Sequence, residues 1–301
     1  MTFGATALTW LADALQQRAQ DLQLTRLRGA TSSQVWRVQA GPVPLAVLRV
    51  LDNQRWLASE PDLAEHEYAA LTFAHSRGLR APRALAHATQ HAGFGAPVVL
   101  MSHLDGDVRL HRTRNQRWLQ LLAEELAHIH SHAAHDLPWR YKTWTERSAL
   151  AVPAWSSTPA AWRHAIEIVI GPEPPVAPVL IHRDYHPTNV LWRDGPSGEV
   201  ISGVVDWINA CSGPAGVDVA HCRANLAIMI GTDAADAFLS AYQRAAPDFD
   251  YQPYWELDGI LDTGRNPSFY PPWSEFGLPD IPAPALRDRV ERYLESILRR
   301  T

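Results

Sequence analysis

The sequence contains little of what defines several large protein classes. Its 301 residues include only two cysteines, Cys211 and Cys222, which are too few for a disulfide framework and lack the spacing of a zinc site. We expect ordinary thiols in a reducing compartment. Lysine and arginine are scattered without a basic run, and the net charge of −5 gives no indication of a nucleic-acid partner.

Long hydrophobic runs are also missing. No stretch approaches the roughly 18 uninterrupted apolar residues that a membrane-spanning helix needs. Polar side chains interrupt residues 1–22 at Asp13, Gln16 and Arg18, so this segment predicts neither a signal peptide nor an anchor. We therefore expect a cytoplasmic protein without a membrane partner. With 46% hydrophobic and 20% charged residues, the composition is that of a globular chain long enough for two lobes.

Hydrophobic periodicity divides the chain into a β-rich front third and a mostly helical remainder. Strands are expected around residues 35–38, 44–50, 83–89 and 97–104, and helices at residues 7–21, 59–77, 114–132, 217–230, 233–245 and 285–299. Residues 104–107 are expected to form a hinge. This order of elements predicts an α+β fold with two lobes, residues 1–104 and residues 105–301.

The residues that carry chemistry lie in two neighbouring motifs. Residues 182–189, HRDYHPTN, match the pattern H-R-D-x-x-x-x-N, and an apolar strand-like run ends in Asp206, seventeen residues past Asn189. Together they form the catalytic-loop and metal-loop arrangement of kinases. In this arrangement His182 is interpreted as a buried histidine that organises the loop, and Arg183 as a structural or exposed residue.

The chemistry of phosphoryl transfer explains these residue types. An alcohol that attacks the γ-phosphate of ATP must lose its proton, and Asp184 is the candidate base that accepts it. The triphosphate also needs a hard cation held by oxygen ligands. Asn189 and Asp206 supply an amide and a carboxylate oxygen, the ligands that Mg²⁺ prefers.

With these motifs, the chain resembles the aminoglycoside phosphotransferase and choline kinase-like family, small-molecule relatives of the protein kinases. The resemblance covers about residues 22–260. It implies a protein-kinase-like fold, in which a small antiparallel β-sheet lobe with a helix binds the nucleotide and a mainly helical lobe carries catalysis and the acceptor. The segment 213–220 resembles the family's segment after the metal loop, in which Asp218 is expected to cap the next helix.

The resemblance also implies nucleotide contacts in the small lobe. Arg49 takes the place of the lysine that usually contacts the α- and β-phosphates. Glu67 would be its partner on a helix, with Glu65 as a second choice. The alternative interpretation is a surface arginine and a solvated glutamate.

No G-x-G-x-x-G motif is present to cover the phosphates. The segment 29–33 is the candidate for this role, because its glycine and its small residues Ser32 and Ser33 leave backbone N–H groups free to cradle a phosphate. A polar hairpin turn would look the same. Met101 and His103 would lie at the adenine-binding hinge, where backbone groups recognise the base.

The resemblance implies a small-molecule hydroxyl acceptor, and the family's acceptors range from aminoglycosides and macrolides to choline, ethanolamine, homoserine and sugars. Between Pro247 and Asp280 the chain has seven acids, one base and eight aromatic residues. Acids among aromatics suit a cationic acceptor, through charge pairing and cation–π contact. A solvated acidic face over a packed aromatic cluster is the competing interpretation.

Three other functions stay open from the sequence. A housekeeping metabolite kinase would share the fold and the site. A nucleotide-binding pseudokinase is suggested by Arg49, although a chain without chemistry has no reason to keep the complete catalytic and metal set. A metal hydrolase would gather His182, Asp184 and His186 around zinc, but the sequence offers no further His/Asp cluster to complete that site. The oligomeric state and the choice between ATP and GTP also stay open.

Overall fold

The computed structural model describes residues 3–89, 92–110, 115–196 and 198–301. Contacts along the chain define two compact units, Met1–Gly106 with Ser202–Ala210, and Asp107–Ile201 with Cys211–Thr301. The first boundary falls within the expected hinge at residues 104–107. The packing of the short segment 202–210 with the first unit was not expected from the sequence pattern.

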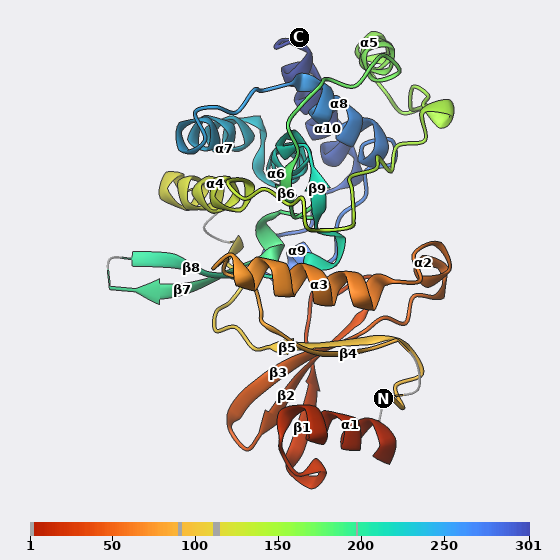
Figure 1. Ribbon diagram of the computed structural model, residues 1–301. Helices are drawn as coiled ribbons and strands as arrows, with labels where there is room; N and C mark the ends of the chain where they lie inside the picture. Colours follow the sequence, from red (N-terminus) through yellow and green to blue (C-terminus); the bar gives the residue numbers. More distant parts are fainter. Residues whose placement is uncertain (1–2, 90–91, 111–114, 197) are drawn as a thin grey trace. The chain divides into compact units, whose positions relative to one another are not determined.

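The first unit is built on an antiparallel sheet of five strands in the order β1-β2-β3-β5-β4 (Figure 1). Its strands are β1 (Leu22–Arg26), β2 (Gln34–Ala40), β3 (Val43–Val50), β4 (Ala84–Ala88) and β5 (Val98–Ser102). The central strand β3 pairs with β2 and β5, so that Arg49 lies opposite Val35 on one side and Val99 on the other. The expected α+β class is confirmed by this sheet and the helical second unit.

Side-chain alternation gives this sheet two different faces. One face carries a buried apolar cluster covered by α1 (Ala5–Leu15), with Trp36, Val38, Ala46, Leu48, Val50, Val98 and Leu100 among its members. Arg49 lies between Leu48 and Val50, so its side chain emerges on the opposite face. There α3 (Leu63–Ser76) packs against β4 and β5. The strand period therefore brings one cation to the face covered by α3.

Helix boundaries in the first unit differ from those expected. The helix expected over 7–21 ends at Leu15, where Gln16 adopts a left-handed conformation, and a 3₁₀ turn follows as η1 (Ala19–Asp21). The helix expected over 59–77 begins at Leu63. It is preceded by a separate helix, α2 (Gln54–Ser59), whose first turn is capped by the side chain of Asn53.

The second unit is mainly helical. Its helices are α4 (Gln116–His130), α5 (Pro159–Val169), α6 (Ala215–Ile230), α7 (Thr232–Ala245), α8 (Pro253–Thr263), α9 (Pro272–Glu275) and α10 (Ala283–Leu298). The helices expected at residues 114–132, 217–230, 233–245 and 285–299 are present with small shifts. The sequence analysis did not anticipate α5, α8 and α9, which begin at prolines that suit the first turn of a helix.

Short strands and 3₁₀ turns carry the two motifs. β6 (Val179–Ile181) pairs with β9 (Cys211–Gly213), and β7 (Val190–Gly195) pairs with β8 (Gly198–Val204). The turn η4 (Pro187–Asn189) leads into β7, and η5 (Trp207–Asn209) follows Asp206. A further short turn is η3 (Arg147–Ala149). No helix within the described ranges combines the length and apolar character needed to cross a membrane.

A buried arginine ties four helices of the second unit together. Arg223 of α6 is fully buried, and its guanidinium contacts the carboxylate of Glu256 on α8, which is 2% exposed. It also donates to the carbonyl of Ala235 at 3.1 Å and to Asp236 at 2.6 Å, both on α7. Tyr293 of α10 donates its hydroxyl to Glu256 at 3.0 Å. This group fixes α6, from which several site residues project.

We expect removal of one charge from this group to cost more stability than removal of both. Arg223→Met leaves Glu256 as an uncompensated buried charge, at a cost of about 3–5 kcal/mol. The double variant Arg223→Met/Glu256→Leu removes both charges and is expected to recover part of that loss. Thermal unfolding followed by circular dichroism measures the difference. Equal melting temperatures for the single and double variants would contradict this explanation.

Candidate active site

The catalytic loop, residues 182–189, is fixed by buried contacts. It follows β6, whose Ile181 pairs with Cys211 of β9. Tyr185 is fully buried and donates its hydroxyl to the carbonyl of Leu122 on α4, at 2.8 Å. The loop backbone is therefore held between the β6–β9 pair and α4.

Asp218 of α6 holds the beginning of this loop. Its fully buried carboxylate accepts the backbone N–H groups of His182 and Arg183, each at 2.6 Å. Burial would raise the pKa of Asp218, but the hydrogen bond and charge of His130, with Nε2 at 3.1 Å, contribute to a net lowering. The expectation that Asp218 caps a helix was wrong. Within the described residues no side chain caps α6, and the carboxylate serves the catalytic loop instead.

Two positions in the motifs adopt left-handed backbone conformations, which are uncommon for residues other than glycine. Arg183 has a φ of 72° and Asp206 a φ of 70°. Such conformations cluster at functional sites, because the surrounding structure must hold them in place. The guanidinium of Arg183 lies 3.8 Å from the ring centre of Trp144 and donates to the carbonyl of Lys142. These contacts give Arg183 a structural role.

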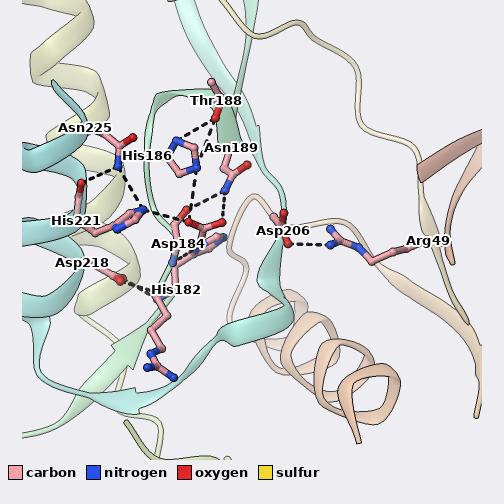
Figure 2. Close-up of polar contacts among 11 residues, drawn as sticks. Arg49, His182, Asp184, His186, Thr188, Asn189, Asp206, Asp218, His221 and Asn225 are labelled. Atoms are coloured by element: carbon pink, nitrogen blue, oxygen red, sulfur yellow. Dashed lines mark hydrogen bonds and ion pairs between the residues drawn. The ribbon is translucent and has the colours of Figure 1, made fainter. Parts of the chain in front are cut away.

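Asp184 lies at the centre of a polar cluster within the second unit (Figure 2). Asn189 donates its side-chain amide to the carbonyl of Asp184 at 2.8 Å and to Oδ2 at 3.1 Å. The other oxygen, Oδ1, lies 3.1 Å from Nε2 of His221 and 3.6 Å from Nε2 of His186. The side chain keeps 32% of its surface exposed, so an incoming group has access to it.

The charge state of Asp184 suits a base. Burial by itself would raise the pKa of this carboxyl. The charge of His186, and the hydrogen bond and charge of His221, act more strongly and hold the pKa well below its usual range. The same contact with Asp184 raises the pKa of His221 against the effect of burial. Asp184 is therefore a carboxylate at neutral pH, the form that accepts a proton.

His221 is the functional residue that the sequence analysis missed. It lies on α6, three residues beyond Asp218, so one helix presents both side chains to the same loop. That helical spacing was the available signal. His182, by contrast, is fully buried, and its Nδ1 accepts the backbone N–H of Asp184 at 3.3 Å. This contact fits the interpretation of His182 as a loop-organising residue.

The first unit holds a second charged group, centred on Arg49 (Figure 2). Nε of Arg49 lies 3.2 Å from the carboxylate of Glu67 on α3, and Nη1 lies 2.9 Å from that of Asp206. Arg49 is only 5% exposed, which argues against a surface arginine. Glu65 is exposed, so of the two candidate partners it is Glu67 that pairs with Arg49.

The segment that carries Asp206 is anchored to the same helix. His66 of α3 lies with its Nε2 2.7 Å from the carbonyl oxygen of Ala210. The backbone N–H of Val204 donates to the carbonyl of Arg80 at 2.8 Å, and Trp207 is fully buried. These contacts explain why residues 202–210 belong to the first unit and hold Asp206 beside Arg49.

The remaining predicted nucleotide contacts also lie in the first unit. Ser32 and Ser33 precede β2, and Gly29 nearby has a φ of 89°. Ser33 is 6% exposed, and its hydroxyl has no hydrogen-bond partner among the described residues. Met101 is buried within β5, and His103 follows that strand, where burial lowers its pKa. Their roles in nucleotide binding stay predictions.

A cavity of about 90 Å³ lies within the second unit, next to the catalytic loop. Its wall includes His221, whose Nε2 contacts Asp184, and Arg183. The segment 141–145 and helix α8 form much of the rest. From the acidic and aromatic segment predicted for the acceptor, α8 contributes Trp255, Asp258 and Asp262.

Other acids of that segment lie elsewhere. Asp248 and Asp250 are exposed, and Glu256 is buried in the ion pair with Arg223. The interpretation as a solvated face or structural cluster fits these three acids, whereas a role of the segment in acceptor binding stays a prediction. Some acids form a solvated face or a structural pair, whereas Asp258 and Asp262 line a cavity.

Comparison with known proteins gives the class of this chain. A model of the family described as "Phosphotransferase enzyme family" matches residues 23–257. That match covers well over half of the chain, so the protein belongs to this family. It is an enzyme of the phosphotransferase class, as predicted. No curated protein sequence matches the chain significantly.

Solved structures share the protein-kinase-like fold, which confirms the expected architecture. One is a Ralstonia eutropha protein assigned to the aminoglycoside phosphotransferases, with a TM-score of 0.67, 14% identity and 99% of each chain covered. Another is a microcompartment-associated aminopropanol kinase, with a TM-score of 0.63 and 15% identity. The match covers 96% of this chain and 98% of the kinase. A third is a thermostable mutant of the aminoglycoside phosphotransferase APH(4)-Ia in complex with ADP and hygromycin B. It has a TM-score of 0.58 and 15% identity, and the match covers 97% of this chain and 99% of that structure's chain.

The burial of Glu67 makes the stability of the first unit depend on pH. Burial raises the pKa of Glu67 to about 7, although Arg49 acts to lower it. Between the unfolded pKa of 4.5 and about 7, the folded chain therefore binds a proton that the unfolded chain has released. This contribution to stability is complete below the unfolded pKa and is lost as the pH rises through 7.

The variant Glu67→Gln is expected to remove the loss of stability that the wild type shows as the pH rises. The melting temperature of the wild type should fall more between about pH 5 and pH 8 than that of Glu67→Gln. Thermal unfolding at several pH values measures the two profiles, with the exposed Glu65→Gln as the matched control. Parallel profiles for wild type and Glu67→Gln would show that Glu67 is already ionised in the folded chain at pH 5.

Proposed function

We propose that this enzyme transfers the γ-phosphate of ATP to a hydroxyl group of a small molecule. The observation that carries the proposal is the partly exposed carboxyl group of Asp184, held in a fixed loop by contacts with Asn189 and His221. Asp184 accepts the proton of the attacking hydroxyl and orients it toward the phosphate. A cytoplasmic location remains a prediction from the sequence.

The oxygen ligands in the two motifs support the use of Mg²⁺. The side-chain nitrogen of Asn189 is engaged twice by Asp184, which leaves its amide oxygen for a cation. Asp206 contributes a carboxylate. These are the hard oxygen donors that Mg²⁺ prefers, and we propose that both residues coordinate it. When bound, the ion would neutralise charge on the triphosphate.

Arg49 and the segment 29–33 are proposed to bind the phosphates. The guanidinium of Arg49 is oriented by Glu67 and Asp206 and can hold a phosphate through its planar fork. The unpartnered hydroxyl of Ser33, with its neighbour Ser32, supports a polar ligand at that loop. Met101 and His103 are proposed to lie at the adenine.

The variants Asp184→Ala and Asp206→Ala distinguish the proposed base from the proposed Mg²⁺ ligand. Asp184→Ala is expected to lower kcat by about 10²–10⁴-fold and to leave the affinity for Mg²⁺-ATP within a few-fold, because a base acts at the transition state. Asp206→Ala should weaken Mg²⁺-ATP binding itself. Calorimetric titration measures the affinity, and Mg²⁺-dependent ADP release with a panel of alcohols measures kcat. Loss of ATP binding in Asp184→Ala would make Asp184 a metal or structural residue.

The acceptor that the cavity supports best is an alcohol that carries an ammonium group. Asp258 is 4% exposed, and its Oδ2 accepts hydrogen bonds from Thr143 at 2.9 Å and Tyr141 at 3.3 Å. Its Oδ1 has no hydrogen-bond partner in the part of the chain that the structure describes. A buried carboxylate oxygen left in this state is costly, and an ammonium group would satisfy it.

A second acid strengthens the preference for a cation. Asp262 lies one helical turn beyond Asp258 on α8, and burial together with the charge of Asp258 raises its pKa. A positive group between the two would relieve this repulsion. Arg183 already lies over the rings of Trp144 and Tyr141, so of the aromatic residues in the wall Trp255 is the one proposed to contact the cation beside the carboxylates.

The size of the cavity narrows the acceptor further. At about 90 Å³ it is smaller than the roughly 150 Å³ cavity that accommodates benzene in an engineered protein. It therefore has room for an ammonium group and a few carbons. Amino alcohols fit this description, as do amino sugars that insert a single amino group.

Asp258→Asn tests this assignment. Loss of the charge is expected to raise KM for an amine-bearing acceptor by about 10–100-fold and to change kcat less, because the ammonium contact lies away from the reacting hydroxyl. Steady-state kinetics with amino alcohols and their uncharged analogues measure both constants. The exposed Asp248→Asn is the matched control, since it makes the same change outside the cavity. Equal KM values for Asp258→Asn and Asp248→Asn would exclude Asp258 from acceptor binding.

A further inference from the structure

Two histidines and the proposed base form a compact group of metal-ligating atoms. One ligand atom each from Asp184, His186 and His221 lies within 4.8 Å of the others. His186 and Asp184 come from the catalytic loop, and His221 comes from α6. Figure 2 shows both imidazoles directed toward the carboxylate. All three residues belong to the second unit, so the group does not depend on the first.

The spacing of these atoms suits a tetrahedral ion. Zinc binds nitrogen and oxygen at about 2.0–2.2 Å, which places neighbouring ligand atoms of a tetrahedron about 3.3 Å apart. Oδ1 of Asp184 lies 3.1 Å from Nε2 of His221 and 3.6 Å from Nε2 of His186. Small side-chain movements therefore bring all three atoms to bonding distance. The fourth position is left for water or a substrate oxygen.

The outer contacts of these residues favour the same arrangement. Thr188 Oγ1 lies 2.9 Å from Nδ1 of His186 and 3.4 Å from Nε2, so the hydroxyl holds the ring with its Nε2 3.6 Å from Oδ1 of Asp184. Asn189 donates to Oδ2 of Asp184, which directs Oδ1 toward the histidines. Nε2 of His221 contacts Oδ1 of Asp184 at 3.1 Å and lies 3.3 Å from Nδ2 of Asn225, and a metal bound to Nε2 would replace these contacts.

We propose that Asp184, His186 and His221 form a binding site for Zn²⁺ and similar transition-metal ions, and that an ion bound there blocks phosphoryl transfer. Imidazole nitrogens suit zinc, cobalt and nickel, whereas Mg²⁺ prefers oxygen ligands and retains water. The site is thus chemically distinct from the Mg²⁺ site proposed at Asn189 and Asp206. The predicted inhibition rests on the proposed function, because the ion would occupy the oxygen of the proposed base. The predicted binding of the ion does not rest on the proposed function.

Metal binding by the full-length chain tests the site without any assay of activity. Co²⁺, titrated in the absence of nucleotide, is expected to give the visible absorption of a four- or five-coordinate ion at one equivalent, and Zn²⁺ is expected to displace it. His221→Ala and His186→Ala should each weaken Zn²⁺ binding by about tenfold or more, since each removes one of three ligands. The exposed His164→Ala is the matched control and should bind as the wild type does. Millimolar Mg²⁺ should not compete.

A second experiment measures the inhibition of phosphoryl transfer by Zn²⁺. Zn²⁺ should inhibit Mg²⁺-dependent ADP release by the wild type, and its inhibition constant should rise in His221→Ala by the same factor as the dissociation constant. Each rate is referred to the same variant without zinc, and circular dichroism verifies that the variants fold. Failure of the wild type to bind Zn²⁺, or binding unchanged in both histidine variants, would overturn the site. Binding without inhibition would overturn the blocking role. A chain that binds Zn²⁺ at these residues but phosphorylates no acceptor would instead count against the proposed function.

Discussion

The catalytic loop depends on one buried carboxylate. Asp218 has no exposed surface, and it keeps its charge because two backbone N–H groups and His130 compensate for the lost hydration. Those hydrogen bonds stabilise the left-handed conformation of Arg183, and the next residue along the chain is Asp184, the proposed base. Arg223, two residues beyond His221 on the same helix, anchors α6 to three other helices. The precision of the site is therefore a property of α6 and its packing.

Much of the fold could be predicted because its signals are local. The β-like runs around residues 44–50 and 97–104 predicted β3 and β5, and in the structure β3 places Arg49 on the face opposite Leu48. The missed helices α5, α8 and α9 each begin at a proline, and the breaker signal of proline masked its preference for the first helical turn. The placement of residues 202–210 with the first unit could not be predicted, because it rests on tertiary contacts such as that between His66 and Ala210.

The site was predictable where a motif states both residue type and spacing. Asp184 and Asn189 are in direct contact, and Arg49 pairs with both Glu67 and Asp206. No motif indicated His221, because its contact with Asp184 is a tertiary contact between a loop and a helix 37 positions further along the chain. The role of Asp218 was misjudged for a similar reason. An acid near the start of a helix has the appearance of a cap, and only the tertiary structure reveals which N–H groups it accepts.

Arg49 joins two acids that come from distant parts of the chain, and it does so through different nitrogens, Nε toward Glu67 and Nη1 toward Asp206. A lysine carries its charge on a single nitrogen and lacks this planar fork, so a direct exchange would weaken one of the two contacts. An exchange of Arg49 for lysine would therefore need compensating changes around it, in the strand, the helix or the segment 202–210. At this position the direction of the donor groups matters as much as the charge that they carry.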